Sequence, residues 1–372
     1  MDDAATMLHR FARDARTIVG AAGVLDDPAS LDRHSTDFWG QYRGRTGLVL
    51  RPGSTAEVQA IVRLAGRHRI ALVPQSGNTG LCGGNLPDAS GRQVVLSLDR
   101  MGRIRHVDPT GDHLVAEAGC VLAEVQRTAA AAGRYFPLSL GSEGSCRIGG
   151  NLSTNAGGVN VLRYGMARDQ VLGLEVVLPT GEIWDGLRAL RKDNTGFDLK
   201  QLFIGAEGSL GVITAAVLKL LPAPRERVTV WLGIERPAQA VALLGLFQAE
   251  LGELVSSFEL LAGFGVEAAA AHLPGVRRPL AGPQPWHLLV EAAWSLQDGL
   301  AARVEAVLET AVARGLVRDG AIAGSEAQRA MMWRIREGQS EATRGLGFIV
   351  RSDVTVPTGA IPQLIERLED WV

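Results

Sequence analysis

The sequence predicts an α+β protein that is divided into two domains. The 372-residue chain is 46% hydrophobic and 21% charged, so it is too long for one ordinary core and too apolar to be disordered. Strand-like and helix-like patterns alternate along its length, and two prolines, Pro222 and Pro224, interrupt them. We therefore expect one domain at residues 1–221 and a second at residues 225–372.

Hydrophobic spacing predicts the helices and strands of the first domain. The clearest boundary is the capping box from Ser54 to Glu57, which starts a helix that runs to about His68. Amphipathic patterns predict two further helices, at residues 5–19 and 122–132. Short apolar runs predict strands at residues 70–73, 94–98, 104–107, 114–118, 171–178, near Trp184 and at 212–220.

The second domain is predicted to contain two strand-helix-strand units. Their helices are expected at residues 237–251 and 298–314. Two such units form the split βαβ arrangement of a ferredoxin-like domain. The strands of these units are predicted at residues 228–234, 254–260, 286–293 and 317–322. The remaining predicted elements are a helix at 326–342, a strand at 348–356 and a helix at 361–371.

The charge balance and the cysteines exclude several kinds of partner. Lys and Arg number 38 and Asp and Glu number 40, so no net field attracts nucleic acid or an anionic membrane, and a small-molecule partner is expected. The widely spaced Cys82, Cys120 and Cys146 indicate neither a disulfide framework nor a zinc cluster. The N-terminal residues mix acids and bases, and no apolar run reaches membrane-spanning length. We therefore expect a cytoplasmic protein without a membrane span.

Glycines gather in three segments and indicate loops that approach a ligand. The chain has 45 glycines, with clusters at residues 77–91, 141–158 and 205–211. Backbone N–H groups of such loops can close on a diphosphate, and a long structureless stretch such as 141–158 usually has a binding role. Any one cluster alone suits an ordinary surface loop. Neither of the first two has the G-x-G-x-x-G or Gly-Lys-Ser/Thr pattern, which disfavours nicotinamide-type Rossmann binding and phosphoryl transfer.

A third segment, residues 193–214, runs from a loop through a short helix into a strand and makes the set recognisable. Together the three clusters resemble the flavin-binding domain of the vanillyl-alcohol oxidase superfamily, most closely its D-lactate, glycolate and D-2-hydroxyglutarate dehydrogenase branch. The resemblance covers residues 37–357. It implies an FAD-binding domain of two subdomains followed by a ferredoxin-like α+β substrate (cap) domain, in an enzyme that oxidises D-2-hydroxy acids by hydride transfer to flavin.

The resemblance also implies which residues bind FAD. The first two clusters are expected at the diphosphate and the flavin, and the third near the adenosine part. Relatives that attach FAD covalently often have a His where this sequence has Thr79, so noncovalent FAD is expected. The expected cofactor-binding residues are Pro74, Ser76, Gly77, Asn78, Thr79, Gly80, Leu81, Gly141, Ser142, Gly144, Ser145, Ile148, Gly149, Asn151, Thr154, Gly157, Glu207, Gly208, Gly211 and Ile213.

The substrate is expected to meet the second domain. Residues 332–342 are similar to the family's substrate-binding helix, where Arg336 and Ser340 are four apart and so share one helix face. Arg336 can clamp a carboxylate through two N–H groups, and Ser340 can add a hydroxyl donor. Arg351 stands where the family commonly has Lys, which keeps the charge but changes its geometry.

The catalytic base and a metal site are left unassigned by the sequence. Relatives continue into a divalent-metal and proton-transfer motif of the type H-x-G-D-x-N-x-H, which does not occur among these 372 residues. The seven histidines show no metal-ligand spacing and are interpreted as ordinary residues. Two alternatives therefore stay open: a truncated or noncatalytic FAD-binding protein, and a non-redox flavin-dependent transferase of the same superfamily. The electron acceptor is unknown, and a homodimer is one assembly that we consider.

Overall fold

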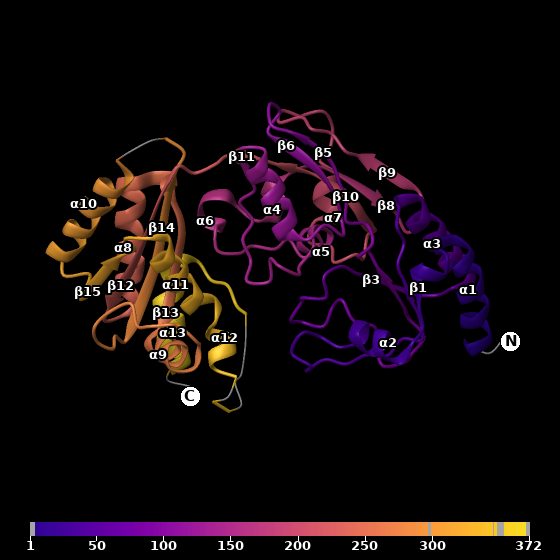
Figure 1. Cartoon of the computed structure of the whole chain (residues 1–372), viewed down its shortest axis with the longest axis horizontal. Coiled ribbons are helices and arrows are strands. Elements are labelled where there is room, and N and C mark those ends of the chain that lie inside the picture. Colours follow the sequence, from indigo (N-terminus) through magenta and orange to yellow (C-terminus); the bar gives the residue numbers. More distant parts are fainter. Residues whose placement is uncertain (1–3, 297–298, 345, 348–352, 370–372) are drawn as a thin grey trace. The chain divides into compact units, whose positions relative to one another are not determined.

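Figure 1 shows the computed structural model of the chain, which describes residues 4–296, 299–344, 346–347 and 353–369. The chain folds into two compact units. The first comprises residues 1–158 and 165–223, and the second comprises residues 159–164 and 224–372. The short segment 159–164, which lies inside the first domain of the prediction, therefore belongs to the second unit.

The first unit begins with a small α/β subdomain. Its sheet has the order β1-β2-β4-β3, with β2, β4 and β3 parallel and β1 antiparallel to β2. The Ser54 hydroxyl accepts the Glu57 backbone N–H at 3.2 Å, which confirms the predicted helix start. Phe11, Ile61 and Leu96 are fully buried in the core that the helices form with this sheet. The elements are α1 (Ala4–Val19), β1 (Val24–Leu25), α2 (Pro28–Ser35), β2 (Val49–Leu50), α3 (Thr55–His68), β3 (Leu72–Gln75) and β4 (Val94–Ser97).

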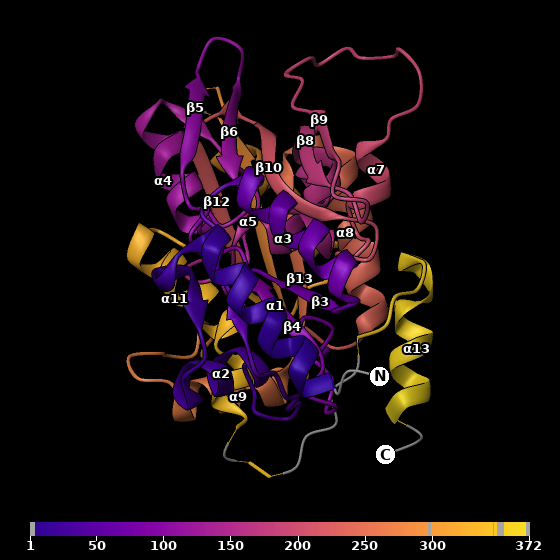
Figure 2. The same cartoon turned by 90° about the vertical axis from the view of Figure 1, so that its right-hand side faces the viewer.

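A five-stranded antiparallel sheet completes the first unit. Its strand order is β5-β6-β10-β8-β9, and β5 and β6 form a hairpin at one edge, as Figure 2 shows. Residues of α4 and α5 pack with this sheet in a core that includes Leu122, Ile148 and Leu174. The elements are β5 (Ile104–Asp108), β6 (His113–Glu117), α4 (Leu122–Ala131), β7 (Arg134–Tyr135), α5 (Ile148–Ser153), β8 (Val171–Val177), β9 (Ile183–Gly186), α7 (Lys200–Phe203), β10 (Val212–Lys219) and β11 (Leu221–Pro222).

The second unit is a four-stranded antiparallel sheet with helices on both faces. Its order, β13-β14-β12-β15, is the ferredoxin-like order that the two strand-helix-strand units predict. Strand residues alternate between the faces: Val230 packs with α8 and α10, whereas Trp231 packs with α9 and α11. The elements are α6 (Val161–Tyr164), β12 (Glu226–Ile234), α8 (Pro237–Leu251), β13 (Val255–Ala262), α9 (Gly263–His272), β14 (Trp286–Trp294), α10 (Leu300–Ala313), β15 (Asp319–Ile322), α11 (Glu326–Glu337), α12 (Gln339–Ala342) and α13 (Ile361–Glu369).

The predicted α+β class is confirmed, and the differences lie in particular elements. Helices α2, α5 and α9 were not predicted. The expected continuous helix at 326–342 is two helices that meet at Gly338, where a Cβ would lie 2.4 Å from Leu273 Cδ1 of the chain after α9. Of the strand expected at 348–356, residues 348–352 lie outside the described residues, and residues 353–356 form no strand.

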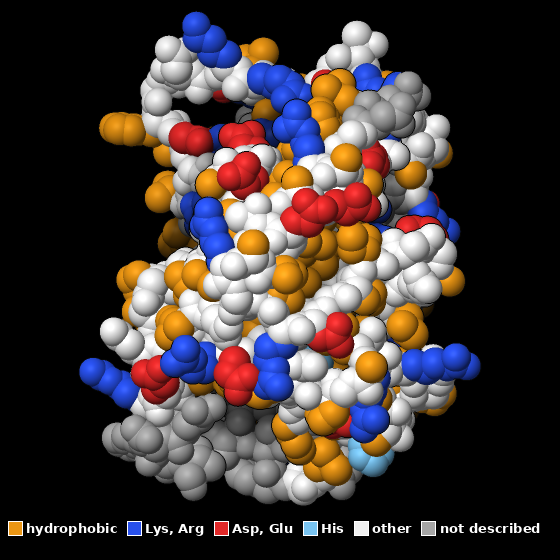
Figure 3. All heavy atoms as spheres, turned by 90° about the vertical axis from the view of Figure 1, so that its left-hand side faces the viewer, with side chains coloured by type: hydrophobic (Ala, Val, Ile, Leu, Met, Phe, Trp, Pro, Cys, Tyr) orange, Lys and Arg blue, Asp and Glu red, His pale blue; other side chains and the backbone are white. Residues whose placement is uncertain are grey.

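The surface carries charges of both signs. On the face that Figure 3 shows, Lys and Arg side chains are interspersed with Asp and Glu side chains rather than gathered into one patch. Within the described ranges, no helix combines the length and the apolar composition that a bilayer crossing requires.

The thiols of Cys82, Cys120 and Cys146 are free, and burial raises the pKa of Cys120 to about 11.

A buried carboxylate joins the sheet of the second unit to α11. Glu291 is only 5% exposed and accepts hydrogen bonds from Thr229 Oγ1 at 2.8 Å, Arg329 Nε at 2.8 Å and Trp333 Nε1 at 2.9 Å. Burial by itself would raise the pKa of Glu291, but these bonds and the Arg329 charge outweigh it and hold the pKa below its ordinary value. The interaction therefore contributes stability only while Arg329 stays in place.

Replacing Arg329 with Met should lower the free energy of unfolding by about 3–5 kcal/mol, because the Glu291 carboxylate would stay buried without its cation. Urea unfolding followed by circular dichroism measures this change. The matched control is Arg318→Met, which removes an exposed ion pair with Glu235 and should cost less than about 1 kcal/mol. Equal losses in the two variants would contradict the role given to Glu291.

The pH dependence of the Arg329→Met variant gives a second measurement. In the wild type the Glu291 pKa lies below its ordinary 4.5, so its contribution is present above that pH and is lost as the pH falls further. In the variant, burial should raise the Glu291 pKa, so the destabilisation is relieved on acidification. The stability gap between the two proteins should therefore narrow between about pH 7 and about pH 4.

Candidate functional site

A hollow with a volume of about 610 Å³ lies within the first unit. Its lining combines five parts of the chain: the end of α2 and the residues after it, the loop after β3, the end of β4, the residue before α4, and the segment before α5. The loop after β3 and the segment before α5 belong to the first two glycine clusters of the sequence. The fold therefore brings these two clusters to one place.

Gly77 permits the contact between the two clusters. A Cβ on Gly77 would lie 2.7 Å from the Ser145 carbonyl oxygen and 2.9 Å from Cys146 Cα. Such distances to backbone atoms are too short for any side chain, so only glycine fits without moving the backbone. The hollow is therefore walled by main chain on two sides.

Helix α5 packs on two other segments, the residue after β6 and the loop after β3, through two more glycines. The Gly149 N–H donates to the Ala118 carbonyl at 2.7 Å, and a Cβ on Gly149 would lie 2.7 Å from Ala118 Cβ. A Cβ on Gly150 would lie 3.1 Å from Ser76 Cβ. The expectation that residues 141–158 are structureless is therefore wrong, because a short helix is fixed here by close backbone packing.

The third glycine cluster reaches the same region. Glu207 and Gly208 both have left-handed backbone conformations, with φ of 51° and 78°. The Glu207 N–H donates to the Ser153 carbonyl at the end of α5, at 2.9 Å, and a Cβ on Gly208 would lie 3.0 Å from Pro74 Cγ. All three clusters therefore converge around Pro74 and the loop that follows it.

Two of the three carboxylates that line the hollow have cationic partners, and the third, Asp37, accepts two backbone N–H groups of the segment that follows it. Asp32 forms an ion pair with Arg43, and Asp99 forms one with Arg51 at 2.8 Å. These pairs reduce the negative charge that would otherwise repel an anionic ligand. The hollow can therefore accept an anion.

The hollow also offers cations and polar atoms to a ligand. Arg33 and Arg147 line it, and Arg147 Nη1 donates to the Gly119 carbonyl, which orients its guanidinium. Ser97 Oγ, in the lining, and Asn151 Nδ2, on α5, are buried and have no hydrogen-bond partner among the described residues. Because buried polar atoms are normally satisfied, these two atoms indicate a missing polar partner.

The expected cofactor residues divide into two groups. Those that line the hollow are Ser76, Gly77, Asn78, Gly144 and Ser145. Those that do not line it are Pro74, Thr79, Gly80, Leu81, Gly141, Ser142, Ile148, Gly149, Asn151, Thr154, Gly157, Glu207, Gly208, Gly211 and Ile213.

Asn78 differs from its expected role as a ligand donor. Its side-chain nitrogen donates to the carbonyls of Arg33 and Thr36 at 3.0 and 3.1 Å, so it ties the loop to α2. Asn78 also takes the left-handed conformation, with φ of 51°, as do Gly83 and Gly91 later in the same loop. Gly80 has no positive φ, and a Cβ there would meet only the flexible Asn85 side chain, at 3.0 Å.

Sequence reasoning missed several residues of the hollow. Arg33 lies on α2, a helix that was not predicted. Ser97 is the last residue of β4, and the apolar sequence of this strand did not indicate that it lines a hollow. Arg147 had a usable signal, because it is a cation inside an otherwise small and polar segment. A guanidinium in such a segment is typical of anion recognition.

The expected substrate residues of the second unit are only partly free to act. Arg336 Nε forms an ion pair with Glu259 Oε2 at 2.7 Å, so its charge is not isolated as expected. Ser340 is exposed but lies on α12, beyond the break at Gly338, rather than on the same helix as Arg336. Arg351 lies outside the described residues.

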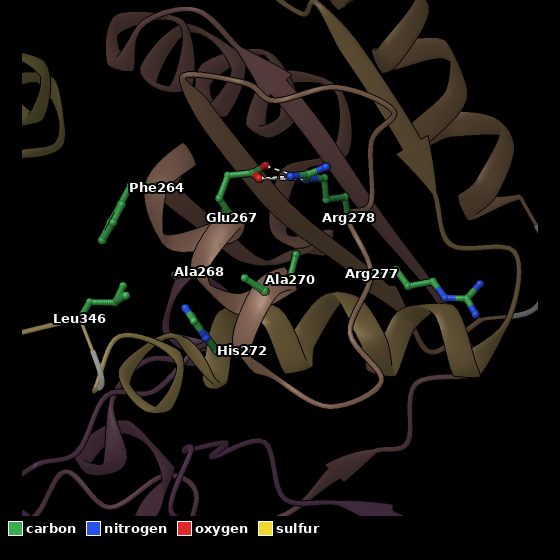
Figure 4. Close-up of a pocket in the computed structure, with 9 residues that line it drawn as sticks. Phe264, Glu267, Ala268, Ala270, His272, Arg277, Arg278 and Leu346 are labelled. Carbon is green, nitrogen blue, oxygen red and sulfur yellow. Dashed lines mark hydrogen bonds and ion pairs between the residues drawn. The ribbon is translucent and has the colours of Figure 1, made fainter.

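A second hollow, of about 580 Å³, lies beside α9 in the second unit. Figure 4 shows that Glu267 and Arg278 point toward each other, and Arg278 Nε donates to Glu267 Oε2 at 2.9 Å. Phe264 and Leu346 add apolar surface to the lining. Neither Arg336 nor Ser340 lines this hollow.

The interpretation of the histidines as unrelated residues differs from their arrangement in the structure. The sequence suggested no metal-ligand spacing among them, but the structure gathers His106, Asp108 and His113, whose ligand atoms lie within 4.8 Å of one another. The signal was available, because residues 106 and 108 share a strand face.

Comparison with protein families identifies both parts of the chain. Residues 46–186 match the model of an FAD binding domain, and residues 223–372 match the model of the C-terminal domain of FAD linked oxidases.

The chain is similar to several curated dehydrogenases. A probable D-2-hydroxyglutarate dehydrogenase of Oryza sativa subsp. indica is 40% identical over 96% of this chain, and the D-2-hydroxyglutarate dehydrogenase of Bos taurus is 38% identical over 93%. The chain spans 64% and 63% of their respective lengths. A D-2-hydroxyglutarate–pyruvate transhydrogenase of Saccharomyces cerevisiae is 36% identical over 92% of this chain and 69% of its own length.

Solved structures with the same fold are more distant in sequence. An alkyldihydroxyacetonephosphate synthase matches with a TM-score of 0.80 at 19% identity, over 98% of this chain and 74% of its own. A p-cresol methylhydroxylase matches with a TM-score of 0.72 at 17% identity, over 91% of this chain and 72% of its own. These likenesses show the fold of the vanillyl-alcohol oxidase type.

The expected cytoplasmic location is contradicted by the relatives. The dehydrogenases of Oryza sativa, Arabidopsis thaliana, Bos taurus and Rattus norvegicus are named as mitochondrial. The expectation was wrong because it relied on the character of the N-terminal residues and on composition, and neither of these reports the compartment of a folded domain.

The relatives and the domain models agree with the geometry of the first unit. A putative D-lactate dehydrogenase of Schizosaccharomyces pombe is 35% identical, and this chain covers 68% of its length. The chain belongs to the FAD-linked oxidase family, in the branch of the D-2-hydroxyglutarate and D-lactate dehydrogenases, and FAD is the cofactor of this family.

Proposed function

We propose that this chain holds FAD noncovalently in its first unit and oxidises a D-2-hydroxy acid of the D-2-hydroxyglutarate, D-lactate or glycolate class to the 2-oxo acid. The observation that carries the proposal is the convergence of three glycine clusters around the loop after β3, where a hollow combines two ion-paired carboxylates with Arg33 and Arg147. The similarity to D-2-hydroxyglutarate and D-lactate dehydrogenases supports the substrate class.

The residues of the hollow fit a dinucleotide. The main chain on either side of Gly77 can approach a diphosphate closely, because no side chain projects from that position. Arg147 is already oriented by its bond to the Gly119 carbonyl, and it can add charge-assisted hydrogen bonds. The unpartnered Ser97 Oγ, which is in the lining, can take a further polar atom of the cofactor.

The second unit supplies the groups for the substrate carboxylate in this proposal. Arg336 uses Nε for Glu259, which leaves the two terminal nitrogens of its guanidinium for a carboxylate. The Glu259 contact would then hold the side chain in one orientation, so less freedom is lost on binding. Ser340 and Arg351 remain proposed contributors.

The flavin, when bound, supplies the redox chemistry by accepting a hydride from the substrate α-carbon. The protein has to bind the carboxylate, orient the α-carbon and remove the hydroxyl proton. Loss of a general base typically lowers the rate by about a hundred-fold to ten thousand-fold. No base is assigned among the described residues, and the electron acceptor and a homodimer are left open.

Acid precipitation should release all flavin into the supernatant, since Thr79 stands where covalently linked relatives offer a His. Fluorescence of the washed pellet and of the supernatant measures the two fractions. A pellet that stays fluorescent would contradict noncovalent attachment.

Gly77→Ala should weaken FAD binding at least about tenfold, or about 1.4 kcal/mol, because the new Cβ would displace the backbone at Ser145 and Cys146. The ratio of FAD to protein after gel filtration measures retention, with circular dichroism to check folding. Gly66→Ala is the matched control, because Gly66 lies in α3 outside the expected cofactor residues and a Cβ there would meet no atom within 4 Å. Full flavin content in a folded Gly77→Ala variant would contradict the cofactor site.

Anaerobic addition of D-2-hydroxyglutarate, D-lactate or glycolate, with a divalent metal supplied, should bleach the flavin absorbance. Arg336→Ala should raise the substrate concentration needed for half-maximal bleaching. The control is Arg334→Ala, on the same helix as Arg336, which removes an exposed ion pair with Glu341 of α12 and should leave that concentration unchanged. A perturbed but unbleached spectrum would indicate binding without turnover. No response to any of these acids would favour a noncatalytic protein or a flavin-dependent transferase.

A further inference from the structure

We propose that the β5–β6 hairpin carries a binding site for a divalent transition-metal ion, formed by His106, Asp108 and His113. The hairpin lies at the edge of the five-stranded sheet of the first unit (Figure 2). The ligand atoms of the three side chains lie within 4.8 Å of one another. The inference does not depend on the proposed substrate or on FAD.

The sheet register brings the three side chains to one face. Asp108 and His113 are directly paired across the antiparallel hairpin, and His106 lies two residues before Asp108 on the same strand. Residues two apart on a strand share a face, as do directly opposed residues. The opposite face carries Val107 and the fully buried Leu114, which pack in the core of the unit and fix the hairpin.

The turn orients the Asp108 carboxylate toward His113. Asp108 Oδ1 accepts the backbone N–H groups of Thr110 and Gly111, both at 2.9 Å, so this oxygen is committed to the turn. Oδ2 is left facing His113 Nδ1 at 3.9 Å, which is too far for a hydrogen bond. A Cβ on Gly111 would lie 2.6 Å from Oδ2 and 2.8 Å from Nδ1, so glycine keeps both atoms clear of a side chain.

His113 Nδ1 has no other use in the described part of the structure. It is buried and has no hydrogen-bond partner among the described residues. The nearby cations have other partners: Arg134 and Arg191 pair with Asp112, and Lys219 Nζ donates to the Asp169 carbonyl. A buried ring nitrogen that faces a carboxylate oxygen without bonding to it is the second observation that indicates a ligand between them.

Two imidazoles and one carboxylate favour Zn²⁺ and similar ions over Mg²⁺ and Ca²⁺, which prefer oxygen ligands. Bonds of about 2.0–2.2 Å in a tetrahedral site place ligand atoms about 3.3 Å apart. Asp108 Oδ2 and His113 Nδ1 therefore need to close from 3.9 Å by only about 0.6 Å. His106 is exposed and can rotate to complete the set, which leaves the fourth position to water.

The test is a titration of the FAD-loaded chain with Co²⁺, followed through the d–d absorption bands of the metal, and with Zn²⁺, followed by calorimetry. We expect saturable Zn²⁺ binding that Co²⁺ competes for and that excess Mg²⁺ or Ca²⁺ does not reduce. The Co²⁺ bands should show nitrogen and oxygen ligands in a four- or five-coordinate site. Absence of saturable Zn²⁺ binding below millimolar concentration would overturn the proposal.

Three variants assign the site. His106→Ala removes an exposed ligand, His113→Ala removes the half-buried ligand, and Asp108→Asn keeps an oxygen for the turn while removing the anionic ligand. Each should weaken Zn²⁺ binding at least about tenfold. His272→Ala, which removes an exposed histidine of the second unit, is the matched control and should bind Zn²⁺ as the wild type does.

The variants also separate loss of the site from loss of the fold. His106→Ala is expected to keep its circular dichroism and FAD content, because the His106 side chain contributes nothing to the core. If His106→Ala and Asp108→Asn both bind Zn²⁺ with wild-type affinity, the ion binds elsewhere and the proposal is wrong.

Discussion

The first unit depends on backbone segments that approach more closely than side chains allow. At Gly77 the limiting atoms are the Ser145 carbonyl oxygen and Cys146 Cα, and at Gly149 they belong to Ala118. Each contact joins segments that are distant along the chain. A helix built on consecutive glycines is intrinsically weak, so α5 draws its stability from this packing rather than from propensity. The shape of the hollow and the existence of the helix therefore have the same cause.

The pairing of charged side chains is a second constraint, which acts in both units. In the second unit, Glu291 is held by Thr229, Arg329 and Trp333, which connect both central strands to α11. Around the hollow, by contrast, Asp32 and Asp99 are paired with arginines, and Arg33 and Arg147 also line it. Charge pairing therefore holds the sheet of the second unit to α11, and in the first unit it reduces the negative charge that a ligand would meet in the hollow.

The sequence predicted those features that local chemistry determines. Helix α8 was placed at 237–251, as observed, because Pro237 marks its start and Gly252 its end. Helices α5 and α9 were missed because both have two glycines in the first turn, which lower helix propensity and are compensated only by tertiary packing. The break at Gly338 was missed for a similar reason, since the close approach of Leu273 to this glycine is a tertiary contact.

The candidate site was predictable in its segments but not in its contacts. The glycine clusters were found, but the role of Asn78 and the pairing of Arg336 with Glu259 depend on residues 42 to 77 positions away. No local pattern encodes such partners. The gathering of His106, Asp108 and His113 was missed because the histidines were compared along the chain rather than across two paired strands.

The segment 159–164 makes the first unit discontinuous and has a consequence for folding order. Asn160 accepts the Ser257 hydroxyl at 3.1 Å, and Arg163 donates to the Ala293 carbonyl, so the second unit closes around a peptide that emerges from the ribosome well before its sheet. These contacts join residues that are far apart in sequence, so forming them closes long loops and costs conformational entropy. That cost is offset only when both segments that connect the units have reached their native positions. A fragment cut at residue 224 would therefore lose a native peptide from its fold and leave Ser257 buried without its acceptor. The two units are distinct as compact bodies, but they are not separable as stretches of chain.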